Sequence, residues 1–213
     1  MKRVNLNVVL ILIVFVFSSS SINAQIIQDY GIKISLTGSN ISVTDKKGIS
    51  ANFAYSDKML VSPSIGLFVI LFKNEYVNVE TELMYLRKGA RSSSDIIGYT
   101  VDDPTIPVTI HVNNEIASQY LQFGVNAQFG GKLIYGIVGP TVNYLTSTDL
   151  AYTDNQLTRL VIGYNVGAGV NLIDVVEKNI FVEIKYIGDF TNFYYSAAKW
   201  WNKSWMLSFG THL

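Results

Sequence analysis

The chain has 213 residues, a formal net charge of zero, 15% charged residues and no cysteine. A soluble domain usually has about 25% charged residues, so this composition is poor in charge for a water-exposed surface. A neutral chain lacks the basic face that nucleic-acid binding requires. The absence of cysteine excludes disulfides, thiolate metal sites and a cysteine nucleophile.

The N-terminus has the pattern of a secretory signal peptide. Lys2 and Arg3 form a charged start, Val8–Phe17 is an uninterrupted apolar run, and Ala24 ends a short stretch of small and polar residues. A helix that spans a membrane needs about 20 apolar residues, so this run is too short to be an anchor. We therefore predict a signal peptide over residues 1–24 that is cleaved after Ala24, and a single domain over residues 25–213.

The remaining chain is predicted to consist of β-strands. The evidence is an alternation of apolar with polar or glycine residues, because successive side chains of a strand face opposite sides. Six segments show it clearly: Tyr30–Leu36, Val77–Tyr85, Leu121–Phe129, Thr158–Leu172, Ile180–Tyr186 and Trp205–Leu213. Two weaker segments, Pro63–Phe72 and Leu133–Leu145, are apolar on both faces or carry a proline, but they bring the number of strands to eight.

The connections between these strands alternate in length. The long ones are Asn40–Val61, Ala90–Ala117, Thr146–Leu157 and Gly188–Asn202, and the short ones are Lys73–Glu75, Gly130–Lys132 and Asp174–Lys178. The longest, Ala90–Ala117, could extend its hairpin above the membrane. Short turns at one end and long loops at the other are typical of outer-membrane barrels. We therefore predict an all-β fold, an eight-stranded antiparallel up-and-down transmembrane β-barrel. A soluble periplasmic lipid-binding barrel is the alternative, and it requires apolar side chains inside.

Several ionisable residues fall on the face that is predicted to line the lumen. An eight-stranded barrel holds little more than side chains, and charges buried there must pair. We favour a static plug of charge pairs over a gate or narrow ion path. The predicted network consists of Lys33, Glu80, Glu82, Arg159, Glu183 and Lys185, with Lys88 near its top.

Aromatic residues gather near both ends of the predicted strands. Rings of this kind accumulate where a membrane protein meets the headgroup layer. The rim with the short turns would carry Tyr30, Phe72, Tyr76, Phe129 and Phe209. The rim with the long loops, including the last loop, would carry a set suited to headgroups or lipopolysaccharide, namely Tyr85, Tyr144, Tyr186, Phe190, Tyr194, Tyr195, Trp200 and Trp201.

No catalytic constellation is evident in the sequence. The two histidines, His111 and His212, lie in a predicted loop and near the C-terminus, and we can assign neither an orienting group nor an oxyanion site to them. Glu80 and Glu82 share the lumen face, where a substrate would have no access. We expect no enzymatic activity, no metal and no cofactor.

Several motifs resemble a known family. The residues Glu-Leu-Met-Tyr-Leu-Arg-Lys-Gly at 82–89, Gly139–Pro140, Gly163–Gly169 and Glu183–Tyr186 resemble the "outer membrane protein β-barrel domain" family. This family is common in Bacteroidetes and includes PorT-like and OmpA-like small barrels. The resemblance implies an outer-membrane barrel and suggests an accessory role in secretion. The chain departs from the family in its last residue, Leu213 in place of Phe.

These observations favour a non-enzymatic barrel of the cell outer membrane with a structural or loop-mediated interaction role. The alternatives are a narrow porin-like channel, a secretion accessory and the soluble lipid-binding barrel. The expected partners are outer-membrane lipid and lipopolysaccharide, the barrel-insertion machinery and an envelope protein bound by the loops, but no nucleic acid.

Overall fold

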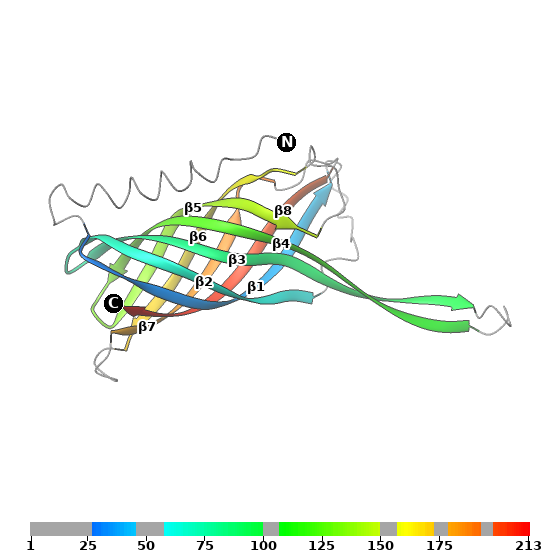
Figure 1. The fold of residues 1–213 in the computed structure, drawn as a ribbon, viewed down its shortest axis with the longest axis horizontal. Helices are drawn as coiled ribbons and strands as arrows, with labels where there is room; N and C mark the ends of the chain where they lie inside the picture. Colours follow the sequence, from blue (N-terminus) through cyan, green and yellow to red (C-terminus); the bar gives the residue numbers. More distant parts are fainter. Residues whose placement is uncertain (1–26, 46–57, 100–106, 150–156, 173–178, 193–197) are drawn as a thin grey trace.

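The computed structural model describes residues 27–45, 58–99, 107–149, 157–172, 179–192 and 198–213. They form one sheet that closes on itself in sequence order (Figure 1). Its strands are β1 (Asp29–Asp45), β2 (Lys58–Lys73), β3 (Val77–Tyr99), β4 (Pro107–Gly130), β5 (Ile134–Thr148), β6 (Leu160–Asn171), β7 (Ile180–Asp189) and β8 (Ala198–His212). The predicted signal peptide at 1–24 lies outside the described residues.

The barrel closes between its first and last strands. β1 pairs with β8 from Gly31↔His212 to Asp45↔Ala198, and all other neighbours are also antiparallel. Closure gives every strand two partners and removes the sheet edges that would otherwise leave backbone groups unpaired. The predicted all-β fold, the strand number and the up-and-down order are confirmed.

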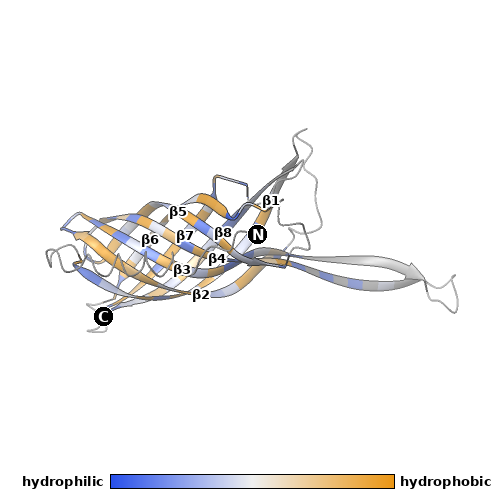
Figure 2. Ribbon diagram, turned by 45° about the horizontal axis from the view of Figure 1, so that its top comes forward, coloured by the Kyte–Doolittle hydropathy of each residue, from blue (hydrophilic) through white to orange (hydrophobic). Residues whose placement is uncertain are grey.

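The two faces of the sheet differ in polarity, and Figure 2 shows hydrophobic and hydrophilic residues alternating along the barrel strands. On β6, Leu160, Ile162 and Val166 are exposed, whereas Val161 and Asn165 are buried. Most buried polar residues belong to the inner face and most exposed large apolar residues to the outer face. A soluble lipid-binding barrel requires the opposite arrangement, so that alternative is wrong.

The short turns and both described chain ends lie at one end of the barrel, which we call the short-turn end. There the amide of Leu213 donates a 3.0 Å hydrogen bond to the carbonyl of Tyr30. The amides of Tyr76 and Val77 donate to the Asn74 side chain at 2.8 and 2.7 Å, which closes the β2–β3 turn. The opposite end, which carries the longer connections, is the long-loop end.

β3 and β4 continue far beyond the other strands at the long-loop end (Figure 1). The segment Ala90–Ala117, the longest predicted connection, does extend the hairpin, because residues 91–99 pair with residues 107–115. At about 3.3 Å per residue, this hairpin extension reaches about 30 Å past Lys58, where β2 begins. β1, β2, β5, β7 and β8 also start earlier or end later at the long-loop end than the alternation indicates.

Pro140 lies inside β5 without ending it. The pairing of β5 with β4 runs from Ser118↔Thr148 to Gly124↔Thr141 and resumes at Ala127↔Val138, so the proline lies at an interruption of this ladder. Pro140 has no partner on β4, so its missing N–H removes no pair there, while it still pairs with Tyr164 on β6. No helix among the described residues is long and apolar enough to cross a membrane.

The lumen is filled by apolar clusters and charged groups that follow one another along the barrel, with buried Ser, Thr, Asn and Gln side chains between them. From the short-turn end, an aromatic floor (Phe68, Ile70, Phe181) is followed by a charged layer around Lys33. An apolar middle layer comes next, then the ion pair of Lys88 with Asp189, and finally an apolar top layer. The middle layer consists of Met84, Leu86, Tyr120, Leu145, Ile187 and Met206, and the top layer of Ile41, Ala90, Ile116, Val161 and Trp200.

Candidate functional site: the charged lumen

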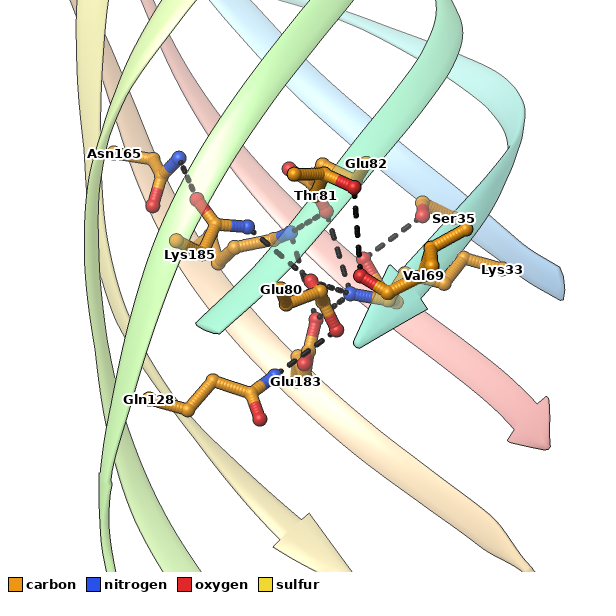
Figure 3. A network of polar contacts seen from close by, with 12 residues as sticks. Lys33, Ser35, Val69, Glu80, Thr81, Glu82, Gln128, Asn165, Glu183 and Lys185 are labelled. Carbon is orange, nitrogen blue, oxygen red and sulfur yellow. Dashed lines mark hydrogen bonds and ion pairs between the residues drawn. The ribbon is translucent and has the colours of Figure 1, made fainter. Parts of the chain in front are cut away.

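Five of the six residues predicted to form the lumen network lie together in one layer. They come from three strands, β1, β3 and β7, and their side chains converge in Figure 3. The strand alternation positions them, because each is an inward residue between two outward ones. Their side chains are at most 2% exposed: Lys33, Glu80, Glu82, Glu183 and Lys185. We refer to these five residues as the charged layer.

Lys33 is the centre of the charged layer. Its Nζ lies 2.6 Å from Glu80 Oε1, 3.0 Å from Glu183 Oε2 and 3.3 Å from Glu82 Oε2. Lys185 Nζ lies 2.6 Å from Glu82 Oε2 and 3.5 Å from Glu183 Oε2. Two ammonium groups thus share three carboxylates, and each lysine contacts at least two of them. Such pairing is what allows charges to remain in a dehydrated interior.

Neutral side chains complete the layer. Gln128 Nε2 donates to Glu80 Oε2 at 3.0 Å, Asn126 Nδ2 to Glu80 Oε1 at 3.2 Å, and the Tyr135 hydroxyl to Glu183 Oε1 at 3.1 Å. The alternation of Leu121–Phe129 predicts an inward direction for Asn126 and Gln128, but their contact with Glu80 depends on the register of β3 with β4, which a single sequence does not reveal.

The aromatic floor adds a second contact for Lys33. Its Nζ lies 5.0 Å from the Phe68 ring centroid and 5.3 Å from that of Phe181, within the range of cation–π attraction. The ring of Phe181 lies over Gly210, and the ring of Phe68 over Gly31, where a Cβ would be too close to each ring. The contribution of Phe68 was not predicted, because its strand is apolar on both faces.

A second buried ion pair lies nearer the long-loop end. Lys88 Nζ is 3.6 Å from Asp189 Oδ1 and donates to Asn143 Oδ1 at 3.1 Å, while Asn202 Nδ2 donates to Asp189 Oδ2 at 3.0 Å. Sequence reasoning placed Lys88 near the top of the lumen but missed Asp189, because the alternation of β7 was followed only to Tyr186. The strand in fact continues to Asp189.

Arg159 does not belong to the lumen network, so this part of the expectation is wrong. Its side chain is exposed and it precedes β6, which begins at Leu160. Arg159 lies in a bend, where strand alternation no longer determines the direction of a side chain. The carbonyl of Arg159 accepts a 2.7 Å hydrogen bond from the amide of Leu145 at the rim.

The aromatic residues of the long-loop end divide between the two faces. Tyr85, Tyr144, Tyr186 and Trp201 lie on the outer face, as predicted, whereas Trp200 is 6% exposed and packs in the apolar top layer. Its predicted place in the outer belt is wrong because β8 begins at Ala198, which gives position 200 inward parity. Tyr194 and Tyr195 lie outside the described residues.

The outer aromatic residues form a chain of contacts over β6, β7 and β8. The ring centroid of Tyr186 lies 5.2 Å from that of Trp205 and 6.2 Å from that of Tyr164, which in turn lies 4.8 Å from Phe190. On the opposite rim, Tyr30, Phe72, Tyr76, Phe129 and Phe209 are all exposed. Rings are therefore exposed on the outer face toward both ends of the barrel.

The chemistry of the charged layer is that of structural charge pairing. Its carboxylates are engaged by lysines and amides, and no group of three or more potential metal ligands occurs among the described residues. His212 Nδ1 lies 2.9 Å from Asp29 Oδ2 at the short-turn end, and its ring packs edge-on against Phe68 and Phe181. His111 lies on β4 in the hairpin extension, not in a loop.

Compared by sequence, the chain matches no protein family and no curated protein. Among solved structures, it is similar in fold to small outer-membrane barrels. The attachment invasion locus protein Ail of Yersinia pestis, solved in complex with the heparin analogue sucrose octasulfate, is 14% identical, with 87% of this chain and 98% of that chain covered and a TM-score of 0.41.

Two further solved structures are similar. Neisserial surface protein A is 9% identical over 85% of this chain and 96% of that chain, with a TM-score of 0.47. The outer membrane protein OprG of Pseudomonas aeruginosa is 12% identical over 87% and 95%, with a TM-score of 0.37. The resemblance to PorT-like proteins is not shown by these comparisons, and the secretion role that it suggests stays a prediction.

Proposed function

We propose that this chain is a non-enzymatic barrel of the bacterial outer membrane that acts as a closed scaffold and presents its β3–β4 hairpin for interaction. The outer face carries the proposal. Ile34, Val61 and Ile65 are 58, 60 and 59% exposed, and they belong to an aliphatic surface that covers a closed sheet. Apolar area left in water costs about 25 cal/mol per Å², whereas bilayer hydrocarbon accommodates it.

The length of the strands supports the same location. The shortest strand, β7, has 10 residues, and about 9–11 residues cross a bilayer at the usual tilt. Aromatic residues at both rims would contact headgroups, and those at the long-loop end would meet lipopolysaccharide. Export through a cleaved signal at 1–24 and assembly by the barrel-insertion machinery are part of this proposal.

The layered lumen supports a scaffold rather than a channel. An aromatic floor, an apolar middle layer and an apolar top layer lie below, between and above the two sets of ion pairs. Beyond the charged layer, an ion would meet a lumen that is filled by these apolar clusters and by buried polar side chains. In planar bilayers, the purified barrel should therefore show no steady conductance, and regular open channels would support the porin-like alternative.

The hairpin extension supports an interaction role. Beyond Lys58↔Arg91 on one side and Ser118↔Thr148 on the other, the described parts of β3 and β4 pair only with each other. Their outer edges therefore carry backbone donors and acceptors that a partner can use by adding a strand. Thr109, His111 and Asn113 are exposed along β4.

Cysteine labelling tests the location and the orientation together, because the natural chain has no cysteine. Thr109→Cys places a thiol on the hairpin extension, and Asn74→Cys places one in the short turn at the other end. In intact Gram-negative cells, a membrane-impermeant maleimide should label the first variant and not the second. Both variants should react after the outer membrane is permeabilised.

Equal labelling of both variants in intact cells, or of neither, would contradict the proposal. A photo-crosslinking residue at position 109 extends the test to the interaction role. It should yield a crosslinked envelope or external protein, whereas the same residue at the exposed Lys203, on the barrel wall, should not. The absence of any adduct at position 109 would argue for a purely structural role.

A further inference from the structure

A pocket of about 550 Å³ opens at the short-turn end of the lumen. Its volume lies in the range of small-molecule sites, which is about 300–1,000 Å³. The turn residues Lys73 and Lys132 line its mouth, and the inner residues Glu80, Gln128 and Tyr135 lead to the charged layer. The pocket thus connects solvent with a buried carboxylate.

The inner part of this pocket presents hydrogen-bond acceptors. Gln128 Nε2 already donates to Glu80 Oε2, and the Tyr135 hydroxyl already donates to Glu183 Oε1. Asn78 also lines the pocket, and its buried Oδ1 has no hydrogen-bond partner among the described residues. A buried acceptor without a donor costs free energy, so a bound donor would be stabilised here.

The net charge of the charged layer, which lies behind the pocket, favours a positively charged ligand. Glu80, Glu82 and Glu183 face two ammonium groups, those of Lys33 and Lys185, so one negative charge is in excess when all five are ionised. Of the two lysines at the mouth, Lys73 is 51% exposed and pairs with Asp29 at 3.4 Å. A cation that enters from solvent would balance the charged layer.

The walls of the pocket suit an apolar body behind that cation. Ile70, Ile180 and Phe181 line it, and Tyr135 adds a second aromatic ring beside the carboxylate. Aromatic rings attract an ammonium group through their faces, and aliphatic walls favour a short alkyl chain over a hydrated inorganic ion. The shape and chemistry therefore select an organic cation.

We propose that the pocket at the short-turn end binds a small alkylammonium ligand, whose ammonium group donates to Glu80 Oε2 and Asn78 Oδ1 and whose alkyl chain packs against Phe181. This assignment depends on the barrel and its lumen, but not on the outer-membrane location or on the role of the hairpin. A failure of either proposal would therefore leave the other untouched.

Methyl NMR of the full folded barrel in detergent micelles tests the assignment, with n-butylammonium as the probe. The methyl groups of Ile70 and Ile180 line the pocket, whereas Ile41 is buried in the apolar top layer at the far end. Titration should shift the signals of Ile70 and Ile180 along a saturable curve and leave Ile41 unchanged. n-Butanol and butyrate at the same concentrations should produce no saturable shift.

Two variants assign the binding groups. Glu80→Gln leaves two carboxylates for two lysines, so the barrel should still fold while the affinity for n-butylammonium falls at least tenfold. Asn78→Leu removes the unpaired acceptor without touching an ion pair and should weaken binding several-fold. Glu115→Gln makes the same charge change at the other end, where Glu115 pairs with Arg87 at 2.7 Å, and should leave binding unchanged.

The assignment is overturned if the wild-type barrel shows no saturable shift, or if n-butanol shifts the same signals as n-butylammonium. It is also overturned if Glu115→Gln weakens binding as much as Asn78→Leu. The wild type and Asn78→Leu decide the question even if Glu80→Gln fails to fold, which the migration of the unboiled protein on SDS gels would reveal.

Discussion

Lys185 on β7 and Glu82 on β3 meet across the full width of the lumen, with Nζ and Oε2 2.6 Å apart. In the closed order of the sheet, three strands separate β3 from β7 in either direction. The pair therefore joins opposite walls of the barrel, and Lys33 joins β1 to β3 and β7 in the same layer. The charged layer thus links opposite walls of the barrel by ion pairs.

Removal of a lysine from the charged layer, which already has more carboxylates than lysines, should destabilise the barrel strongly. Lys185→Met keeps most of the side-chain volume but leaves Glu82 without its 2.6 Å partner in a fully buried site. Breaking a buried ion pair typically costs about 3–5 kcal/mol. Urea unfolding of the refolded barrel in vesicles should show a loss of about this size. Lys203→Met, which changes an exposed lysine on β8, should change stability by less than about 0.5 kcal/mol.

The double variant Lys185→Met with Glu82→Gln separates lost pairing from a general loss of packing. It removes one base and one acid, so a neutral amide replaces the carboxylate that loses its nearest lysine in the single variant. At least half of the lost stability should return, measured in the same urea series. If the double variant instead loses as much stability as Lys185→Met and Glu82→Gln lose together, the two residues do not act as a pair.

Gly210 is required by the aromatic floor. A Cβ there would lie 2.1 Å from Phe181 Cζ, and this ring is already packed against Phe68 and His212 at centroid distances of 5.3 Å. Gly210→Ala should therefore lower stability by about 1–3 kcal/mol, as overpacking of a core does. Gly131→Ala is the matched control, because its Cβ would meet nothing nearer than 4.0 Å. Equal thermal unfolding midpoints for both variants would refute this account of the floor.

The assignment of the two faces predicts the accessibility of the tryptophans to lipid. Trp205 is 53% exposed on the outer face, whereas Trp200 is 6% exposed inside the barrel. In vesicles of lipids with brominated acyl chains, a variant that keeps only Trp205 should be quenched strongly, and one that keeps only Trp200 should be quenched little. Stronger quenching of Trp200 would mean that the faces are reversed.

The hairpin extension should be dispensable for the stability of the barrel. Replacing residues 92–114 with a two-residue Asn-Gly turn joins Arg91 to Glu115, which are already opposite each other in the register. Because the extension pairs with no other described strand, the free energy of unfolding measured in urea should change by less than about 1 kcal/mol. A variant that no longer refolds would show that the extension contributes to the fold.

Strand alternation predicted the fold and most of the charged layer, because lumen and exterior impose opposite polarity on every second residue. Lys33, Glu80, Glu82, Glu183 and Lys185 needed only correct parity to be placed inside. On the inner face of β6, Gly169 lies against the Tyr135 ring, where a Cβ would be 2.3 Å from Cζ, so this glycine makes room for a bulky neighbour.

The predictions were wrong or incomplete at the long-loop end, where the alternation between lumen and exterior stops. The hairpin extension lies beyond the other strands, so neither of its faces is selected for polarity, and alternation does not predict where its strands end. The other wrong or missed residues lie at the long-loop end: Arg159, Asp189 and Trp200. There, an error of a few residues in a strand boundary assigns a side chain to the wrong face or leaves it unassigned. Contacts between strands, such as that of Gln128 with Glu80, depend on the register, which no local pattern contains.

The most direct test of the central claim, a closed barrel embedded in the outer membrane, combines membrane fractionation with gel migration on one sample. A Gram-negative host expressing the chain is separated into outer-membrane, inner-membrane and soluble fractions, and each fraction is run on SDS gels with and without boiling. A closed barrel in the outer membrane should give a band in the outer-membrane fraction that changes its migration only on boiling. A soluble periplasmic band with the same migration before and after boiling would contradict it.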